Sequence, residues 1–291
     1  MPPPEKSNGR PGENIDVKTV EGFGDEWTRF DQSELAASER QTIFEMYFSI
    51  FPWHTIGRDA TGFDLGCGSG RWAQLVAPRV GHLHCIDPSV AIDVARRNLA
   101  GETNCTFHRA SVDAIPLPDN SMDFGYSLGV LHHVPDTEAG IRSCVRKLKP
   151  GAPFLTYIYY AFDNRPWWFG PLWQVSYAIR GVIARFPVGL RYWTCQLLAA
   201  TVYWPLARTA LLLEKAGVSV TNFPLSAYRS RTFYGMRSDA LDRFGTHLEK
   251  RFTRAEITGM MERSGLERIV FLPRVPFWTA VGYRRADDPT P

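Results

Sequence analysis

A glycine-rich turn after a short apolar segment constrains the fold more than any other stretch of this chain. Residues 62–65 are followed by GCGSG at residues 66–70, and the pattern predicts a buried strand, a tight turn and then a helix near residues 71–79. Glycines at alternate positions let the backbone turn and leave no Cβ in the way, so a ligand can lie directly on the turn. The sequence therefore predicts a ligand site at the end of this strand.

The spacing of the glycines separates two classes of ligand. A dinucleotide fingerprint has the pattern G-x-G-x-x-G, because its pyrophosphate rests on the start of the following helix. This chain has G-x-G-x-G with Arg71 at the place of the third glycine, and Asp64 at the strand end would repel a pyrophosphate. A ligand with a cationic amino-acid end suits Asp64 better, and S-adenosylmethionine carries both an ammonium and a sulfonium. A dinucleotide-dependent oxidoreductase stays open as an alternative.

The segments downstream of the turn strengthen this interpretation. Residues 82–87 alternate apolar and polar side chains and end at Asp87, about twenty residues past the turn, where an acid can hydrogen-bond a ribose diol. The chain carries, in order, DLGCGSG, CIDPS, ASVDAIPLPDNSMDFGYS, LGVLHHVPD and LKPGAPF. This order resembles the class I S-adenosylmethionine-dependent methyltransferases, in particular the small-molecule branch that includes the quinone and sterol methyltransferases. The resemblance covers roughly residues 60–160 and a tail from about 252 to 283.

The resemblance implies a set of site residues around the methyl donor. His132 and His133 are the predicted catalytic residues, because the pair follows the fourth strand beside the donor and an imidazole titrates near neutrality. His133 can instead hydrogen-bond the backbone and hold the turn. No metal site is expected, because His82 and His84 can share a strand face but a third ligand is not apparent. The residues predicted to bind S-adenosylmethionine are Asp64, Gly66, Cys67, Gly68, Asp87, Pro88, Ser89, Ser111, Val112, Asp113, Leu128 and Gly129.

Segments of strand and helix type alternate from about residue 60. This alternation predicts an α/β fold with a parallel sheet, right-handed crossovers, helices on both faces, and ligands beyond the carboxyl ends of the strands. The resemblance implies a Rossmann-like, doubly wound sheet of seven strands, six parallel and the last antiparallel, with a helical, aromatic-rich insert. Strands are expected near residues 61–65, 82–87, 105–109, 122–127, 153–160, 267–272 and 277–283, and helices near 71–79, 89–100, 137–148 and 254–264.

The chain is expected to form one domain with an insert. A polar, Pro- and Gly-rich start predicts a disordered tail over residues 1–20, and Ser33 is a plausible N-cap for the helix after it. Aromatic residues within residues 21–30 either cap the edge of the core or form a flap over the cofactor. The expected parts are the N-terminal helix and cofactor-binding core over 21–160, the acceptor-side insert or lid over 161–235, and the C-terminal completion of the sheet over 236–291.

The insert carries five of the nine tryptophans and is punctuated by arginines. Its most apolar run, residues 192–207, would span about 24 Å as a helix, whereas a bilayer has a hydrocarbon core of about 30 Å, so a spanning segment is not expected. A buried lid helix and an interfacial helix that touches a membrane are the two alternatives. The predicted acceptor-binding residues are Tyr160, Asp163, Asn164, Arg165, Trp167, Tyr228 and Tyr234.

Composition narrows the partners and the compartment. A net charge of +3 with interspersed acids and bases argues against a dedicated nucleic-acid partner. Five scattered cysteines without a C-x-x-C pair are typical of reduced thiols in a cytoplasmic protein. We expect an S-adenosylmethionine-dependent methyltransferase that acts on a small molecule, first by O-methylation of a natural-product, sugar or amphiphilic acceptor. The alternatives are C-methylation of a polyprenyl, quinone or lipid-like acceptor, and a non-catalytic S-adenosylmethionine-binding protein in regulation or assembly.

Overall fold

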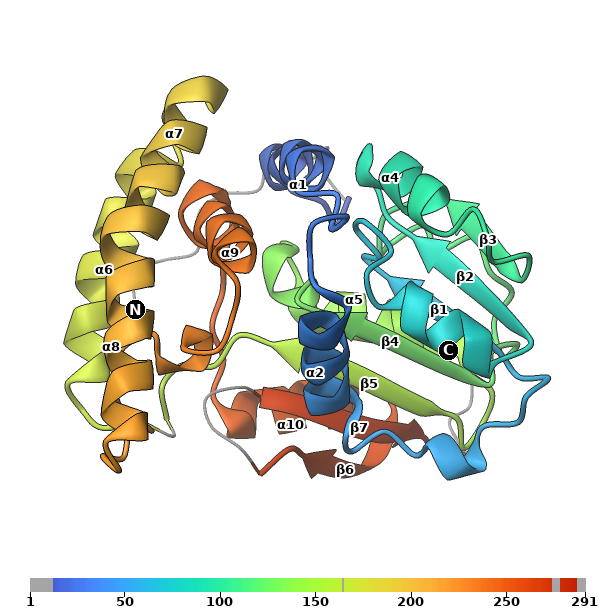
Figure 1. Ribbon diagram of the computed structural model, residues 1–291. Coiled ribbons are helices and arrows are strands. Elements are labelled where there is room, and N and C mark those ends of the chain that lie inside the picture. Colours follow the sequence, from blue (N-terminus) through green and yellow to red (C-terminus); the bar gives the residue numbers. More distant parts are fainter. Residues whose placement is uncertain (1–12, 164, 274–277, 287–291) are drawn as a thin grey trace.

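The computed structural model describes residues 13–163, 165–273 and 278–286. A seven-stranded sheet has helices on both faces, and a separate layer of helices lies at one end of the molecule (Figure 1). The predicted α/β class is confirmed, because six strands run parallel and β7 runs antiparallel to both of its neighbours. The strands are β1 (Thr61–Leu65), β2 (His82–Ile86), β3 (Cys105–His108), β4 (Phe124–Leu128), β5 (Pro153–Ile158), β6 (Leu266–Phe271) and β7 (Trp278–Arg284).

The strand order fixes where a ligand can bind. It reads β3-β2-β1-β4-β5-β7-β6. The chain passes from β1 outwards to β2 and β3, and it then crosses back to β4 on the other side of β1. A crevice opens beyond the carboxyl ends of parallel strands at such a switch point. The loops that begin at Gly66 and Gly129, after β1 and β4, therefore lie at the expected site.

Two apolar cores flank the sheet, and each is closed by its own helices. On one face, Phe44, Phe48 and Ala95 belong to the core with strand residues such as Tyr126. On the other face, Ile141 and Met261 do so with strand residues of the opposite pleat. The covering helices are α2 (Ala37–Phe48), the short α3 (Ala73–Val76) and α4 (Ala91–Asn98) on the first face, and α5 (Thr137–Lys147) and α10 (Arg254–Arg263) on the second.

A third apolar core holds the insert together. It is built from Ile183, Cys195, Ala199, Tyr203 and several residues of a helix at the end of the insert. That helix, α9 (Phe233–Gly245), begins before the expected boundary at residue 235 and packs against both α6 and α7. Because α9 packs with the insert, the insert ends about ten residues after the predicted boundary at residue 235. Its other elements are α6 (Phe169–Ile183), α7 (Val188–Leu198), the π-helical turn η4 (Ala199–Tyr203), α8 (Trp204–Lys215) and the 3-10 turn η5 (Ser226–Tyr228).

Two expectations for the N-terminal segment need correction. Residues 17–20 are not a tail, because α1 (Val17–Arg29) begins there, with the Asp16 carboxylate accepting a hydrogen bond from the Thr19 N–H at 2.9 Å. Residues 1–12 lie outside the described residues. Ser33 is not an N-cap, because its N–H and hydroxyl both donate to Asp31 in a turn before α2. Among the described residues, no helix combines the length and the apolar character needed to cross a bilayer.

Candidate active site

The glycine turn after β1 is tightly enclosed. Gly66, Gly68 and Gly70 all have positive φ values, +76°, +53° and +77°, which side chains rarely tolerate. A Cβ on Gly66 would come within 2.3 Å of the Val130 side chain, and one on Gly68 within 2.9 Å of Trp27 Nε1. The turn therefore requires glycine for two reasons: its backbone has positive φ values, and the Val130 and Trp27 side chains pack directly against it.

Asp87 lies at the end of β2 beside this turn. Its Oδ2 atom accepts a hydrogen bond from the Gly68 N–H at 3.0 Å, and its Oδ1 atom accepts from the N–H and hydroxyl of Ser89 at 2.9 and 2.6 Å. Burial raises the pKa of this carboxyl above its ordinary value. A carboxylate offers about four acceptor positions, so three donors leave one on Oδ2 for a ligand hydroxyl.

A cavity of about 110 Å³ lies between α1 and the strand ends. Its wall includes eight of the residues predicted to bind the cofactor, namely Gly66, Asp87, Pro88, Ser89, Ser111, Val112, Leu128 and Gly129. The structure thus brings together segments that follow β1, β2, β3 and β4. We refer to it below as the cofactor cavity.

Four predicted cofactor residues lie behind this wall rather than on it. Asp64 is buried, its Oδ2 atom has no hydrogen-bond partner among the described residues, and burial raises its pKa to about 8. Cys67 packs in the core, and Gly68 faces the indole of Trp27. Asp113 accepts hydrogen bonds from the Ser111 hydroxyl and from the Asn14 N–H, which closes one end of the cavity.

Helix α1 covers the cofactor cavity, which supports the flap alternative for residues 21–30. It lies between α4 and α9 above the strand ends (Figure 1). Thr19, Val20, Phe23 and Trp27 line the cavity from this helix. Asn14 fixes the segment before it, because its side-chain amide exchanges two hydrogen bonds of 2.7 Å with the backbone of Asp136. Access to the cavity is thus controlled by α1.

The two histidines after β4 have different surroundings. The ring Nδ1–H of His133 donates to the Leu248 carbonyl oxygen at 2.7 Å, the backbone contact proposed as its alternative role, and His133 lines the cofactor cavity. His132 is fully buried, stacks on the Tyr159 ring at 3.8 Å, and has no hydrogen-bond partner for either ring nitrogen among the described residues. Burial lowers the pKa of His133 to about 4 and that of His132 far below its ordinary value. The lowered pKa favours the neutral form of His132, which can accept a proton. However, His132 lines neither the cofactor cavity nor either of the two cavities that follow.

A second cavity, of about 100 Å³, adjoins the first and is rich in charged groups. Phe23, Trp27, Leu128 and Gly129 line both cavities, so the second begins at the end of β4. We call it the polar chamber. The ionisable side chains in its wall are Glu26, Tyr47, Arg71, Tyr157, Tyr159, Tyr228, Arg231, Asp239, Asp242 and Arg243.

Two carboxyl groups of the polar chamber have unusual proton affinity. Burial and the neighbouring charge of Asp239 raise the pKa of Asp242 to about 7, although its Oδ2 atom accepts a hydrogen bond from the Tyr159 hydroxyl at 3.0 Å. Burial and the charge of Asp242 also raise the pKa of Glu26, whose Oε1 atom accepts from the Ser238 hydroxyl at 2.9 Å. Asp242 can therefore gain or lose a proton near neutral pH.

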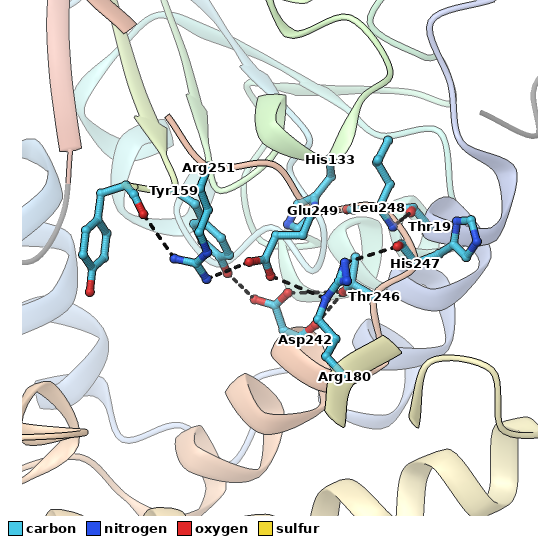
Figure 2. A network of polar contacts seen from close by, with 11 residues as sticks. Thr19, His133, Tyr159, Arg180, Asp242, Thr246, His247, Leu248, Glu249 and Arg251 are labelled. Atoms are coloured by element: carbon cyan, nitrogen blue, oxygen red, sulfur yellow. Dashed lines mark hydrogen bonds and ion pairs between the residues drawn. The ribbon is translucent and has the colours of Figure 1, made fainter. Parts of the chain in front are cut away.

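A buried polar network links α1, the segment 246–252 and the insert (Figure 2). Glu249 pairs with Arg251 at 2.7 Å and with Arg180 of α6 at 3.9 Å. Although burial alone would raise the pKa of Glu249, the two guanidinium groups hold it below its ordinary value. On the other side, His247 contacts the Asp16 carboxylate at 3.2 Å. The cap of α1 and the insert thus share one set of contacts.

The third and largest cavity, of about 310 Å³, lies inside the insert and is mainly apolar. It lies between α6, the end of α7, η4, α8 and residues 223–228, with Phe169, Trp173 and Leu206 among its lining residues. Tyr228 and Arg243 belong to its wall and also to that of the polar chamber. We call it the apolar cavity.

Some of the predicted acceptor residues line the apolar cavity or the polar chamber, and others do not. Tyr160 and Arg165 line the apolar cavity, and Tyr228 lines both it and the polar chamber. Asp163 does not, because its carboxylate accepts from the Arg254 N–H and the Trp278 indole N–H at 2.9 and 3.0 Å. Two further predictions also lie elsewhere, because Trp167 is 85% exposed and Tyr234 accepts a hydrogen bond from the Gln32 N–H. Asn164 is outside the described residues.

The predicted site residues include none of those that α1 and α9 contribute to the polar chamber. Trp27 lies in a segment whose aromatic pattern did raise the flap alternative, so this signal was present. Asp242 lies in a stretch of interleaved charges, which is usually a solvated face. Nothing in the sequence shows that α9 turns this face towards the end of β4.

The residues around the cofactor cavity fit S-adenosylmethionine. The turn at Gly66 and Gly68 has no Cβ, Asp87 keeps one acceptor position that would suit a ribose hydroxyl, and the buried Asp64 carboxyl lies behind the wall at the end of β1. Apolar contacts from Val112 and Val20 suit a flat base. The donor set therefore agrees with this cofactor.

Comparison with known proteins agrees with this site. Residues 63–156 match the family model of a methyltransferase domain. The chain is 28% identical over 145 residues to the ubiquinone biosynthesis O-methyltransferase of Hahella chejuensis, a match that covers 49% of this chain and 61% of that protein. It is 34% identical over 103 residues to phosphoethanolamine N-methyltransferase 2 of Caenorhabditis elegans, a match that covers 34% of this chain and 24% of that protein. The matches thus span less than two thirds of either curated relative.

Solved structures share the fold. An S-adenosylmethionine-dependent methyltransferase of Methanosarcina mazei has a TM-score of 0.50 and 17% identity, and the match covers 82% of this chain and 99% of that one. A chain from the Haloferax volcanii complex of the Trm112 methyltransferase activator with a methyltransferase gives 0.51 and 14%, with coverage of 90% and 97%. Residues 63–156 thus match a methyltransferase domain, and the chain shares the fold of solved S-adenosylmethionine-dependent methyltransferases.

Proposed function

We propose that the chain transfers a methyl group from S-adenosylmethionine to a small amphiphilic acceptor, at an oxygen atom. The observation that carries this proposal is that the three cavities adjoin one another through shared wall residues. The cofactor cavity and the polar chamber share Leu128 and Gly129, and the polar chamber and the apolar cavity share Tyr228 and Arg243. An acceptor with an apolar body and a polar tip matches the second and third cavities in that order.

When bound, the cofactor supplies an activated methyl group on a sulfonium, which a nucleophile displaces directly. The protein must therefore align the acceptor and exclude water. Helix α1 covers the cofactor cavity with Phe23 and Trp27, and the polar chamber lies beneath the same two residues. With α1 in place, the acceptor would enter from the side of Tyr228 and Arg243, which border the apolar cavity.

An acceptor hydroxyl needs a group that takes its proton, and Asp242 suits this role better than His132. Asp242 lines the polar chamber and has a pKa of about 7, whereas His132 lies behind Tyr159. The Tyr159 hydroxyl holds the Asp242 carboxylate in place at 3.0 Å. The catalytic role of His132 and His133 stays a prediction, with positioning of the loop after β4 as its alternative.

The proposed compartment of the protein is the cytoplasm. All five cysteines are free, and Cys85 is one of three that lie buried or half-buried at the same end of the sheet. Unpaired thiols at close range support a reducing compartment such as the cytoplasm.

The proposed function is tested with a series of phenolic acceptors that carry alkyl chains of increasing length. Release of S-adenosylhomocysteine should rise along the series, because longer chains bury more apolar surface in the cavity. Equal activity with the headgroup alone would contradict the role of the apolar cavity. No release with any acceptor, together with tight cofactor binding, would favour the non-catalytic alternative. Methylated carbon in the product would favour C-methylation instead.

A further inference from the structure

The outer side of α6 carries a stripe of exposed apolar side chains. Leu172, Val175, Ile179 and Val182 are 47%, 60%, 45% and 58% exposed, and their spacing of three, four and three residues places them on one face of the helix. The opposite side of α6 packs against α9. These side chains are therefore not covered by packing on α9, and three of them, Leu172, Val175 and Ile179, border the apolar cavity.

Helix α7 repeats the arrangement. Leu190, Trp193 and Leu197 are 55%, 69% and 62% exposed and are again spaced by three and four residues, while the inner side of α7 contacts α9. Trp167, just before α6, is 85% exposed. A monomeric protein rarely leaves so many large apolar side chains together in water, and such patches mark interaction sites.

The charge of the same segment is one-sided. Residues 164–213 contain no Asp or Glu and five arginines, of which Arg180 is buried and paired with Glu249, whereas the whole chain has a net charge of only +3. Arg185 and Arg191 flank the turn between α6 and α7. A symmetric contact with a second copy would bring two such cationic faces together, which costs electrostatic free energy. The partner that fits is apolar within and anionic at its surface.

The apolar cavity opens on this face. Leu172, Val175 and Ile179 line the cavity and are also among the exposed side chains of the α6 stripe. We propose that the outer face of α6 and α7 docks on an anionic lipid surface, where its exposed apolar side chains enter the interface and its arginines meet lipid phosphates. The route by which a lipid-dissolved acceptor then enters the cavity rests on the proposed function, but the docking does not.

Vesicle flotation without any acceptor tests the docking. The protein should float with vesicles that contain phosphatidylglycerol and stay at the bottom with vesicles of pure phosphatidylcholine. Arg185→Gln with Arg191→Gln should lower the partition coefficient by about fivefold for each arginine removed. Trp193→Ser with Leu197→Ser should abolish flotation, whereas the matched control Val270→Ser, at a 51% exposed position on β6, should leave it unchanged.

The outcomes separate docking from catalysis. Unchanged flotation of the Trp193/Leu197 variant, or equal flotation with both vesicle types, would overturn the proposal. A dimer in light scattering that the same two substitutions dissociate would also overturn it, because the face would then be an interface between copies. Thermal unfolding checks that the variant is folded. S-adenosylhomocysteine release with detergent-dispersed acceptor should be retained in this variant, so a docked but inactive protein would refute the proposed function alone.

Discussion

At the residue scale, cofactor affinity depends on Asp87, whose carboxylate keeps one acceptor position beside the turn. Asp87→Ala should weaken S-adenosylhomocysteine binding by about 1.5–3 kcal/mol, because a hydrogen bond to a charged group is lost. Titration calorimetry measures the change. Asp119→Asn, at an exposed ion pair with Lys147 and Arg146, is the control and should bind normally. Unchanged affinity in the Asp87 variant would remove Asp87 from the site.

Asp242 should give the reaction its pH dependence. Its pKa is raised to about 7 and a base acts in the deprotonated form, so kcat should increase as the pH rises through about 7 and then level off. In Asp242→Asn this rise should be absent and kcat should be at least about 10²-fold lower. Asp239→Asn, in the same chamber, should keep the rise. A normal pH profile for the Asp242 variant would exclude it as the base.

His132→Ala distinguishes the catalytic prediction from the arrangement in the structure. Because His132 supports Tyr159 by stacking and lines none of the three described cavities, its loss should lower kcat by less than tenfold at saturating acceptor. The S-adenosylhomocysteine affinity should stay nearly intact. A loss of about 10²-fold or more in kcat would instead restore His132 as the base.

A larger share of the predicted cofactor residues than of the predicted acceptor residues lines a cavity. Gly66, Asp87 and Gly129 directly follow strands, so period and turn residues place them at one edge of the sheet. Trp167 and Tyr234 were chosen as aromatic residues of the insert, yet the packing of helices decides which aromatic side chains face inwards. That packing is tertiary and leaves no local signal.

At the element scale, helix α1 must move for cofactor to enter. The cofactor cavity beneath it holds only about 110 Å³, whereas small-molecule sites commonly measure about 300–1,000 Å³. Amides of residues 17–29 should therefore exchange hydrogen quickly in the free protein and slowly once S-adenosylhomocysteine is bound. Residues 254–263 of α10, on the other side of the sheet core, serve as control and should not change. Equal protection of α1 in both states would mean that it is static.

The same helix shows where local patterns misled the prediction. Strands β1, β2 and β5 begin at the predicted residues, because each is a short run with a strand-like pattern that is bounded by turn residues. Helix α1 begins within the predicted tail, where the Asp16 cap and packing on α4 and α9 stabilise it. Ser33 has the right residue type for a cap, but Asp31 binds it in a turn.

At the scale of the whole molecule, the buried ion network joins the insert to the sheet. Glu249→Gln would leave Arg180 and Arg251 buried without a counter-charge, so unfolding in urea should show a loss of about 3–5 kcal/mol. The exposed pair of Glu138 with Arg263 is the control, and Glu138→Gln should cost less than about 1 kcal/mol. Equal effects of the two substitutions would mean that the network contributes little.

The apolar cavity should set acceptor affinity without affecting the cofactor. Trp173→Ala removes a large lining side chain and should raise the acceptor KM by roughly 10- to 100-fold, while the S-adenosylhomocysteine Kd stays constant. Trp167→Ala is the matched control, since Trp167 is exposed and does not line the apolar cavity. With acceptor dispersed in detergent, this substitution should leave the acceptor KM unchanged. Parallel effects of both substitutions would show that the cavity does not hold the acceptor.

The insert is the part of the molecule that the sequence predicted least. Its helical and aromatic character was evident, but three helices and a π-helical turn meet there, and α9 joins them from beyond the expected boundary. The core sheet can be predicted from the alternation of strand and helix segments and from the turn residues between them, because both are local features of the sequence. The cavities between the insert and the sheet arise only when both are assembled.

A crystal structure with S-adenosylhomocysteine tests the central claim most directly, because it shows where the donor lies relative to the three cavities. The predicted complex has the ribose hydroxyls at the Asp87 carboxylate and α1 over the ligand, with the sulfur beside Gly129 and directed towards the polar chamber that contains Asp242. A ligand bound away from the glycine turn, or a sulfur atom directed away from the polar chamber, would contradict the account.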